Sequence, residues 1–171
     1  ANGMNNAISV LAAAPRGCLL NAPDVYMDKI ACGPGAKGCI DLTDTVENNI
    51  NRVAKALGKK VEDITVAVLK RERHNKLVDE IRSTGARIKM VTDGDILTAI
   101  ETCFESSGVD MVMGVGGAPE GVIAAAALKC LDGDFQGRLL PTDEQQMKRC
   151  KELHSDLEKI FKIDDLVKGN D

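Results

Sequence analysis

The feature that most constrains the fold of this chain is an alternation of apolar and amphipathic segments over residues 64–131. Three apolar runs have the length and composition of buried strands, at residues 64–69, 87–91 and 109–115. Each is followed by a segment with helical spacing, at residues 74–84, 95–104 and 119–131. Strands joined in this way by helices pair in parallel through right-handed crossovers. The spacing therefore predicts a parallel β-α-β-α-β-α unit.

The segments on either side of this unit are less regular. The first forty residues indicate a β-rich part, with a strand at residues 7–14, a short one at 18–20 and an apolar stretch at 25–30. Residues 45–57 have helical spacing, with Thr43 or Thr45 as N-cap and Gly58 as terminator. Residues 143–160 predict a charged surface helix, and no final element is evident after it. We expect a single α/β domain, or part of one, over residues 1–171.

The composition supports this class and excludes others. Hydrophobic residues make up 44% and charged residues 28% of the chain, as in a globular protein, and the lack of Trp indicates an aliphatic core. The net charge of −4 argues against nucleic acid as the main partner. No apolar run reaches the roughly 20 residues that span a bilayer. The six cysteines form no C-x-x-C pair, so we expect reduced, mostly buried thiols in a cytoplasmic protein.

Three loops carry the chemistry that this fold would gather. In parallel α/β sheets the carboxyl ends of the strands lie along one edge, where ligands bind. The loops after the three predicted strands contain Lys70-Arg71-Glu72-Arg73, Asp93-Gly94-Asp95 and Gly116-Gly117-Ala118-Pro119-Glu120-Gly121. Arginines bind phosphate, and carboxylates bind hard metal ions or sugar hydroxyls. The three loops together predict a site for a phosphorylated polyol beside a metal ion.

Each of these residues also has a structural explanation. The arginines suit an exposed surface pair, Asp95 suits a helix N-cap, and Glu120 suits a first helical turn, where a carboxylate stabilises free N–H groups. The single tyrosine, Tyr26, suits a half-buried position in the core. His74 suits packing or capping at the start of a helix. The common nucleotide-binding and serine-hydrolase motifs do not occur.

Several stretches of the chain resemble class II fructose-1,6-bisphosphatases, the metal-dependent sugar phosphatases of bacteria. The resemblance is carried by residues 21–29, 33–38, 73–74, 93–95, 116–121 and 131–139, and it covers nearly the whole chain. It implies the layered α/β sugar-phosphatase fold that inositol monophosphatases share. It also implies hydrolysis of the 1-phosphate of fructose 1,6-bisphosphate in gluconeogenesis, by a water that Mn²⁺ or Mg²⁺ activates.

The same resemblance implies roles for individual residues. Glu120 matches a metal ligand of the family. The positions that match its substrate contacts are Tyr26, Arg71, Glu72, Arg73, Asp93, Gly94, Asp95 and Gly117. At the position of Glu72 the family often has proline.

Members of this family are longer at both ends, and their remaining metal ligands and water-activating residues lie in an amino-terminal half. We therefore expect the 171 residues to resemble a carboxy-terminal portion that is inactive alone and that acts in a homo-oligomer or with a second polypeptide. Two alternatives stay open. One is a phosphatase of another polyol, such as sedoheptulose bisphosphate or an inositol phosphate. The other is a non-catalytic module that binds sugar phosphates.

Overall fold

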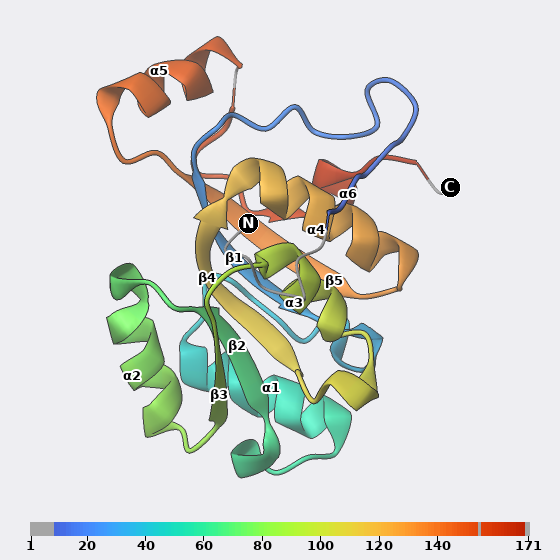
Figure 1. The fold of residues 1–171 in the computed structure, drawn as a ribbon, viewed down its shortest axis with the longest axis vertical. Helices are drawn as coiled ribbons and strands as arrows, with labels where there is room; N and C mark the ends of the chain where they lie inside the picture. Colours follow the sequence, from blue (N-terminus) through green and yellow to red (C-terminus); the bar gives the residue numbers. More distant parts are fainter. Residues whose placement is uncertain (1–8, 154, 170–171) are drawn as a thin grey trace.

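A computed structural model describes residues 9–153 and 155–169 of the chain. Its centre is a six-stranded mixed sheet with the order β3-β2-β4-β1-β5-β6 (Figure 1). The strands are β1 (Tyr26–Cys32), β2 (Thr65–Leu69), β3 (Arg87–Val91), β4 (Met111–Gly117), β5 (Asp134–Leu140) and β6 (Phe161–Lys162). The helices are α1 (Val46–Leu57), α2 (Asn75–Ser83), α3 (Asp95–Glu101), α4 (Ala118–Cys130), α5 (Glu144–Glu152) and α6 (Ile163–Leu166).

The predicted parallel unit is confirmed. β2 pairs in parallel with β3 on one side and with β4 on the other, although the β2–β4 ladder joins only Val66 to Met111 and Ala67 to Val112. The helices α2, α3 and α4 follow these strands, within a few residues of the predicted bounds. Thr45 caps α1 by accepting a hydrogen bond from the Asn48 amide at 3.1 Å, and Gly58 ends it in the left-handed region at φ 63°.

The antiparallel part of the sheet was not predicted. β1 lies between β4 and β5 and runs antiparallel to both, with seven residue pairs in each ladder. β5 falls in a stretch that is rich in glycine and charge at its start, which weakens the strand signal. Burial between two neighbours stabilises it instead, since Phe135 is 1% exposed.

Both ends of the chain differ from expectation. Residues 9–14 form no strand, and the first part of the predicted 7–14 strand lies outside the described residues. The predicted strand at 18–20 is a single bridge between Leu19 and Val167. The charged helix after residue 143 is shorter than predicted, and the tail then adds β6 and α6, where Leu166 is fully buried. The prediction that no element follows was wrong because α6 has only four residues and little periodicity.

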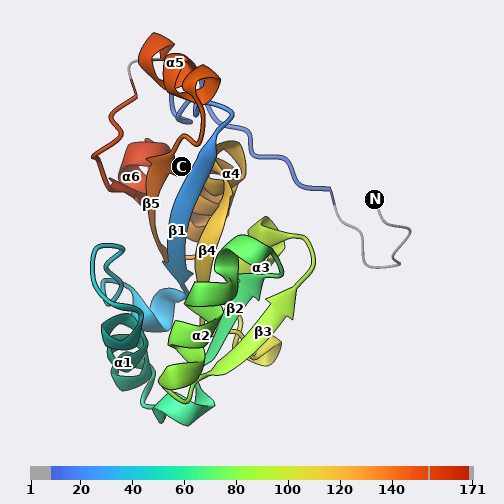
Figure 2. The ribbon, with the colours of Figure 1, turned by 90° about the vertical axis from the view of Figure 1, so that its left-hand side faces the viewer.

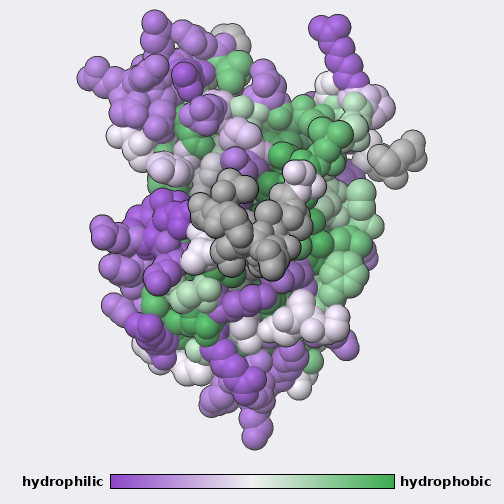
Figure 3. All heavy atoms as spheres, in the orientation of Figure 1, coloured by the Kyte–Doolittle hydropathy of each residue, from purple (hydrophilic) through white to green (hydrophobic). Residues whose placement is uncertain are grey.

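Helices cover both faces of the sheet, and each face has its own core. One core packs α1 and α2 against the sheet through residues such as Ile50, Ile81 and Met111. The other packs α3, α4 and α6 against it through residues such as Leu128 and Phe135. Figures 1 and 2 show α5 at one end of the molecule, where the buried Cys150 joins it to the second core, and Figure 3 shows hydrophilic side chains over it. Both cores are aliphatic apart from two phenylalanines, as predicted.

The cysteines are all free thiols, but only Cys32 and Cys150 are buried, so the expectation of mostly buried thiols was wrong. Within residues 9–153 and 155–169, no helix combines the length and the apolar character that crossing a membrane requires.

The close contact between α4 and β1 generates a prediction. A Cβ at Gly121 would lie 2.8 Å from the Met27 sulfur, in a core where Met27 is 0% exposed. Alanine favours a helix over glycine by about 1 kcal/mol, whereas overpacking costs about 1–3 kcal/mol. We expect Gly121→Ala to lower the midpoint of urea unfolding, followed by circular dichroism. The reverse exchange Ala127→Gly, at a partly exposed position of α4, measures the difference in helix propensity alone. A higher midpoint for Gly121→Ala would contradict the close packing of α4 against Met27.

Candidate functional site

The sheet topology creates a crevice between the loops that follow β2 and β4. These strands are parallel neighbours, but the chain leaves β2 toward α2 on one face and leaves β4 toward α4 on the other. Adjacent parallel strands whose connections diverge in this way leave a space at their carboxyl ends, where ligands bind in open α/β sheets. The loops at residues 70–74 and 116–120 border that space.

Arg73 joins these two loops. Its Nε and Nη2 donate to the carbonyl of Val115 at 3.2 and 2.7 Å, and its guanidinium lies 4.8 Å from the ring centroid of Tyr26. Tyr26 pairs with Gly117 across the β1–β4 ladder and is 38% exposed, so it is a surface residue at the site rather than a core residue. Arginine has five N–H donors, which leaves several free to bind an anion here.

His74 fixes the position of Arg73. The imidazole is 2% exposed, its Nδ1 lies 2.7 Å from the carbonyl of Leu69, and its Nε2 lies 2.8 Å from the amide nitrogen of Val115. A carbonyl only accepts and an amide N–H only donates, so Nδ1 carries the proton and Nε2 accepts. The ring thus joins β2 to β4 beyond the end of their short ladder. This is the structural role that the sequence suggested for His74, although no capping hydrogen bond is present.

Glu120 turns back toward the end of β4. α4 begins at Ala118, one residue earlier than predicted, so Glu120 is its third residue. A Cβ on Gly117 would fall 1.9 Å from Glu120 Oε2, which places the carboxylate directly over that glycine. No side-chain hydrogen bond caps α4, so capping does not account for the orientation of Glu120 among the described residues. The exposed carboxylate is therefore free to take an external cation.

Asp95 reaches the same strand end from α3. Gly94 occupies the N-cap position at φ 88°, a conformation that favours glycine, and Asp95 is the first residue of the helix rather than its cap. Asp95 Oδ2 lies 2.7 Å from Lys29 Nζ, which also donates to the carbonyl of Gly117 at 3.1 Å. Lys29 is buried on β1 and links the loop after β3 to the loop after β4.

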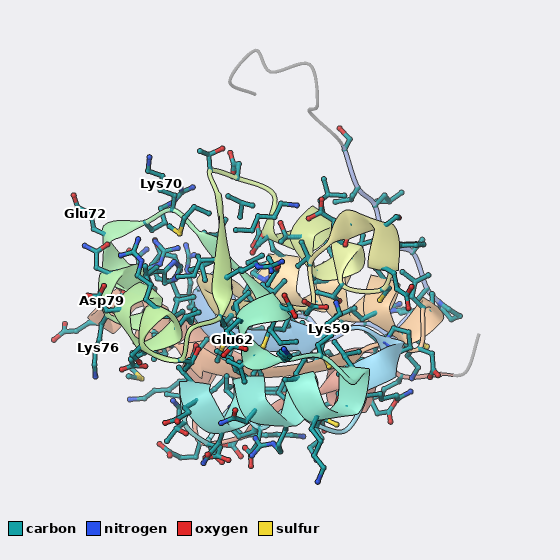
Figure 4. The ribbon with its side chains drawn as sticks, turned by 90° about the horizontal axis from the view of Figure 1, so that it is seen from below. Lys59, Glu62, Lys70, Glu72, Lys76 and Asp79 are labelled. Atoms are coloured by element: carbon teal, nitrogen blue, oxygen red, sulfur yellow. The ribbon has the colours of Figure 1, made fainter. Side chains whose placement is uncertain are left out.

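Two predicted residues lie one strand further out. Arg71 donates to the carbonyl of Thr92 at 2.8 Å, and its Nη2 lies 3.9 Å from a carboxylate oxygen of Asp93, whose side chain is 78% exposed. Arg71 and Arg73 therefore contact the ends of different strands. Glu72 points away from the body of the molecule, as Lys70 does (Figure 4).

The structure thus brings together five of the predicted site residues at residues 115–117 of β4: Tyr26, Arg73, Asp95, Gly117 and Glu120. It also reveals three residues that sequence reasoning missed, Asp28, Lys29 and Arg138. Asp28 stands between Val115 and Arg138 in the sheet, with 3.8 Å between its carboxylate and the Arg138 guanidinium. The charged residues inside the otherwise apolar run at 25–32 were a signal for Asp28 and Lys29, because a charged side chain is rarely buried in a central strand unless it is paired.

The metal-binding capacity of these residues is limited. Within residues 9–153 and 155–169, no group of three or more His, Cys, Asp or Glu side chains is arranged to hold a metal ion. Glu120 offers one exposed carboxylate, whereas Asp95 already has Lys29 as its partner. A metal ion bound to Glu120 would need its other ligands from outside the described residues.

The environment of Asp28 generates a pH prediction. Burial raises the pKa of the Asp28 carboxyl above 3.8, although the positive charge of Arg138 opposes the shift. The folded chain then holds this proton more tightly than the unfolded chain, so the group stabilises the fold below about pH 4, and that stabilisation is lost as pH rises through the folded pKa.

We expect Asp28→Asn to raise the urea midpoint relative to the unmodified chain at pH 7 and to lose this advantage near pH 4. A constant difference between the Asp28→Asn and unmodified chains across this range would contradict the assignment.

Comparisons with known proteins show the family of the chain. The family model described as "Bacterial fructose-1,6-bisphosphatase, glpX-encoded" matches residues 1–171. The "Fructose-1,6-bisphosphatase 1 class 2" of Escherichia coli (strain K12) is 41% identical over 183 aligned residues, covering 99% of this chain and 54% of that protein. The "D-fructose 1,6-bisphosphatase class 2/sedoheptulose 1,7-bisphosphatase" of Prochlorococcus marinus (strain NATL1A) is 44% identical over 183, covering 99% and 55%. The chain spans about half the length of these curated relatives. It belongs to the glpX-encoded bacterial fructose-1,6-bisphosphatase family.

Proposed function

We propose that this chain forms the substrate-binding side of a class II fructose-1,6-bisphosphatase and supplies one ligand of its metal site. The observation that carries the proposal is the convergence of Arg73, Asp95 and Glu120 on three consecutive residues of β4, 115–117. A cation for phosphate, a carboxylate for sugar hydroxyls and an exposed carboxylate for a metal ion are the groups that such a substrate needs. Membership of the family supports the same reaction.

In this proposal each residue of the chain has a defined task. The free donors of Arg73 hold the phosphate that is not cleaved, and the Tyr26 ring contacts the guanidinium at 4.8 Å from its centroid. Asp95 accepts hydrogen bonds from the sugar, and the missing side chain of Gly117 leaves room for the Glu120 carboxylate above it. Arg71 and Asp93 form an outer pair that the ligand reaches only if it extends past the end of β3.

The chemical step adds water to the phosphorus of the 1-phosphate and breaks the bond between that phosphorus and the sugar oxygen, releasing inorganic phosphate and fructose 6-phosphate. A bound Mn²⁺ or Mg²⁺ would lower the pKa of the attacking water and neutralise charge on the phosphate. Glu120 would hold such an ion by one oxygen. Because a hard metal ion takes several oxygen ligands, we expect the 171-residue chain alone to release no phosphate.

A second substrate has a specific observation in its favour. The Prochlorococcus marinus relative is named for both fructose 1,6-bisphosphate and sedoheptulose 1,7-bisphosphate. Both sugar bisphosphates are therefore candidate ligands for titration calorimetry.

The role of Arg73 leads to a binding prediction. We expect Arg73→Gln to weaken fructose 1,6-bisphosphate binding by about tenfold or more in titration calorimetry, since a charge-assisted hydrogen bond to phosphate is lost. Lys76→Gln removes the same charge from a residue whose side chain is 90% exposed and points away from the site, and it should bind as the unmodified chain does (Figure 4). Equal affinities for the two variants would contradict the proposal.

The role of Glu120 leads to a metal prediction. We expect Glu120→Gln to reduce Mn²⁺ binding to the bisphosphate-loaded chain by at least about tenfold, measured by electron paramagnetic resonance of free Mn²⁺. The urea midpoint should change little, because no capping bond is lost. Glu62→Gln, at another exposed glutamate, is the matched control. A lower midpoint with unchanged Mn²⁺ binding would instead assign Glu120 a purely structural role.

A further inference from the structure

Lys29 is a buried cation in the middle of the sheet that has no role in the proposed function. It lies on β1 and is 8% exposed. Its partners across the two neighbouring strands are Gly114 on β4 and Gly137 on β5, neither of which has a side chain. A charged side chain is costly to bury, so an unshielded lysine in this position needs a strong partner.

The ammonium group finds its partners at the end of β4. Lys29 Nζ lies 2.7 Å from Asp95 Oδ2 and 3.1 Å from the carbonyl oxygen of Gly117. Lys29 therefore holds the start of α3 and the backbone at the end of β4 against β1. The Asp95 side chain keeps 19% of its surface exposed, so part of it remains open to an external group.

The glycines of the 116–121 loop make room for this lysine. A Cβ on Gly116 would lie 2.8 Å from Lys29 Nζ and 2.7 Å from Asp95 Oδ2. A Cβ on Gly121 would lie 3.3 Å from Lys29 Cδ. Gly116 is thus required by the lysine and its partner, whereas Gly121 lies closest to the Met27 sulfur and Gly117 faces Glu120.

We propose that Lys29 is a positioning residue, which holds the Asp95 carboxylate and the Gly117 carbonyl in the arrangement that recognises the sugar part of the ligand. The inference rests on the proposed function. Lys29 itself is covered by the loop and does not touch the ligand. Arg73 is anchored separately, to Val115 and Tyr26, so it keeps its affinity for phosphate when Lys29 is changed.

This separation defines the experiment. In titration calorimetry on the 171-residue chain, we expect Lys29→Met to weaken fructose 1,6-bisphosphate binding by about tenfold or more, as for one charge-assisted hydrogen bond. Binding of inorganic phosphate should change by less than about twofold, because Arg73 is anchored separately. A purely structural defect would instead weaken the binding of both ligands. Lys59→Met is the matched control: Lys59 pairs with the buried Asp110 at 2.6 Å, away from the crevice, and its loss should leave both affinities unchanged.

A double variant tests whether Lys29 acts through Asp95. In the Asp95→Asn background, Lys29→Met should have a much smaller effect on bisphosphate binding than it has alone. Circular dichroism establishes that each variant is folded, and Lys29→Gln, which keeps a donor of similar reach, replaces Lys29→Met if the latter does not fold.

The outcomes separate the two proposals. If the unmodified chain binds no bisphosphate, the proposed function fails and the role of Lys29 fails with it. If the unmodified chain binds but Lys29→Met binds equally well, or loses phosphate and bisphosphate affinity alike, only the positioning role is overturned.

Discussion

The insertion of β1 between β4 and β5 is the constraint on which the rest of the site depends. Both ladders are antiparallel and seven residues long, so β1 is held in register from Tyr26 to Cys32. Alternation along a strand then sends Tyr26 and Asp28 to one face and Lys29 to the other. One strand therefore supplies the platform under Arg73 and the cation beneath Asp95, and a slip of one residue would exchange the two faces.

The site also depends on a gap in the sheet that a side chain bridges. β2 and β4 share only two residue pairs and then diverge, and the divergence opens the crevice. His74 spans the opening between Leu69 and Val115, so the strands separate by a fixed amount. The adjacent Arg73 is carried into the crevice as a result. A buried polar ring is stable here because both of its nitrogens have partners.

Much of the fold and part of the site could be predicted from local pattern. The strands β2, β3 and β4 and the helices that follow them could be predicted because their apolar residues recur at regular spacing. These elements also predicted that the loops carrying Arg73, Asp95 and Glu120 lie along one edge of the sheet. The separation of Arg71 from Arg73 could not be predicted. Each arginine turns toward the strand end whose backbone carbonyl accepts its hydrogen bond, and local sequence does not indicate which carbonyl that is. β5 and α6 were missed because long-range burial, rather than periodicity, stabilises them.

The sequence by itself determined the chemistry of the loops: which carboxylates, arginines and glycines follow which strands, and that three strands run in parallel. Only the tertiary structure decided which of those groups meet. Lys29 is 66 residues from Asp95 along the chain, and their 2.7 Å contact exists because β1, from outside the parallel unit, pairs with β4 at its centre. The pairing of distant strands is set by total burial over the whole sheet, which no local spacing encodes.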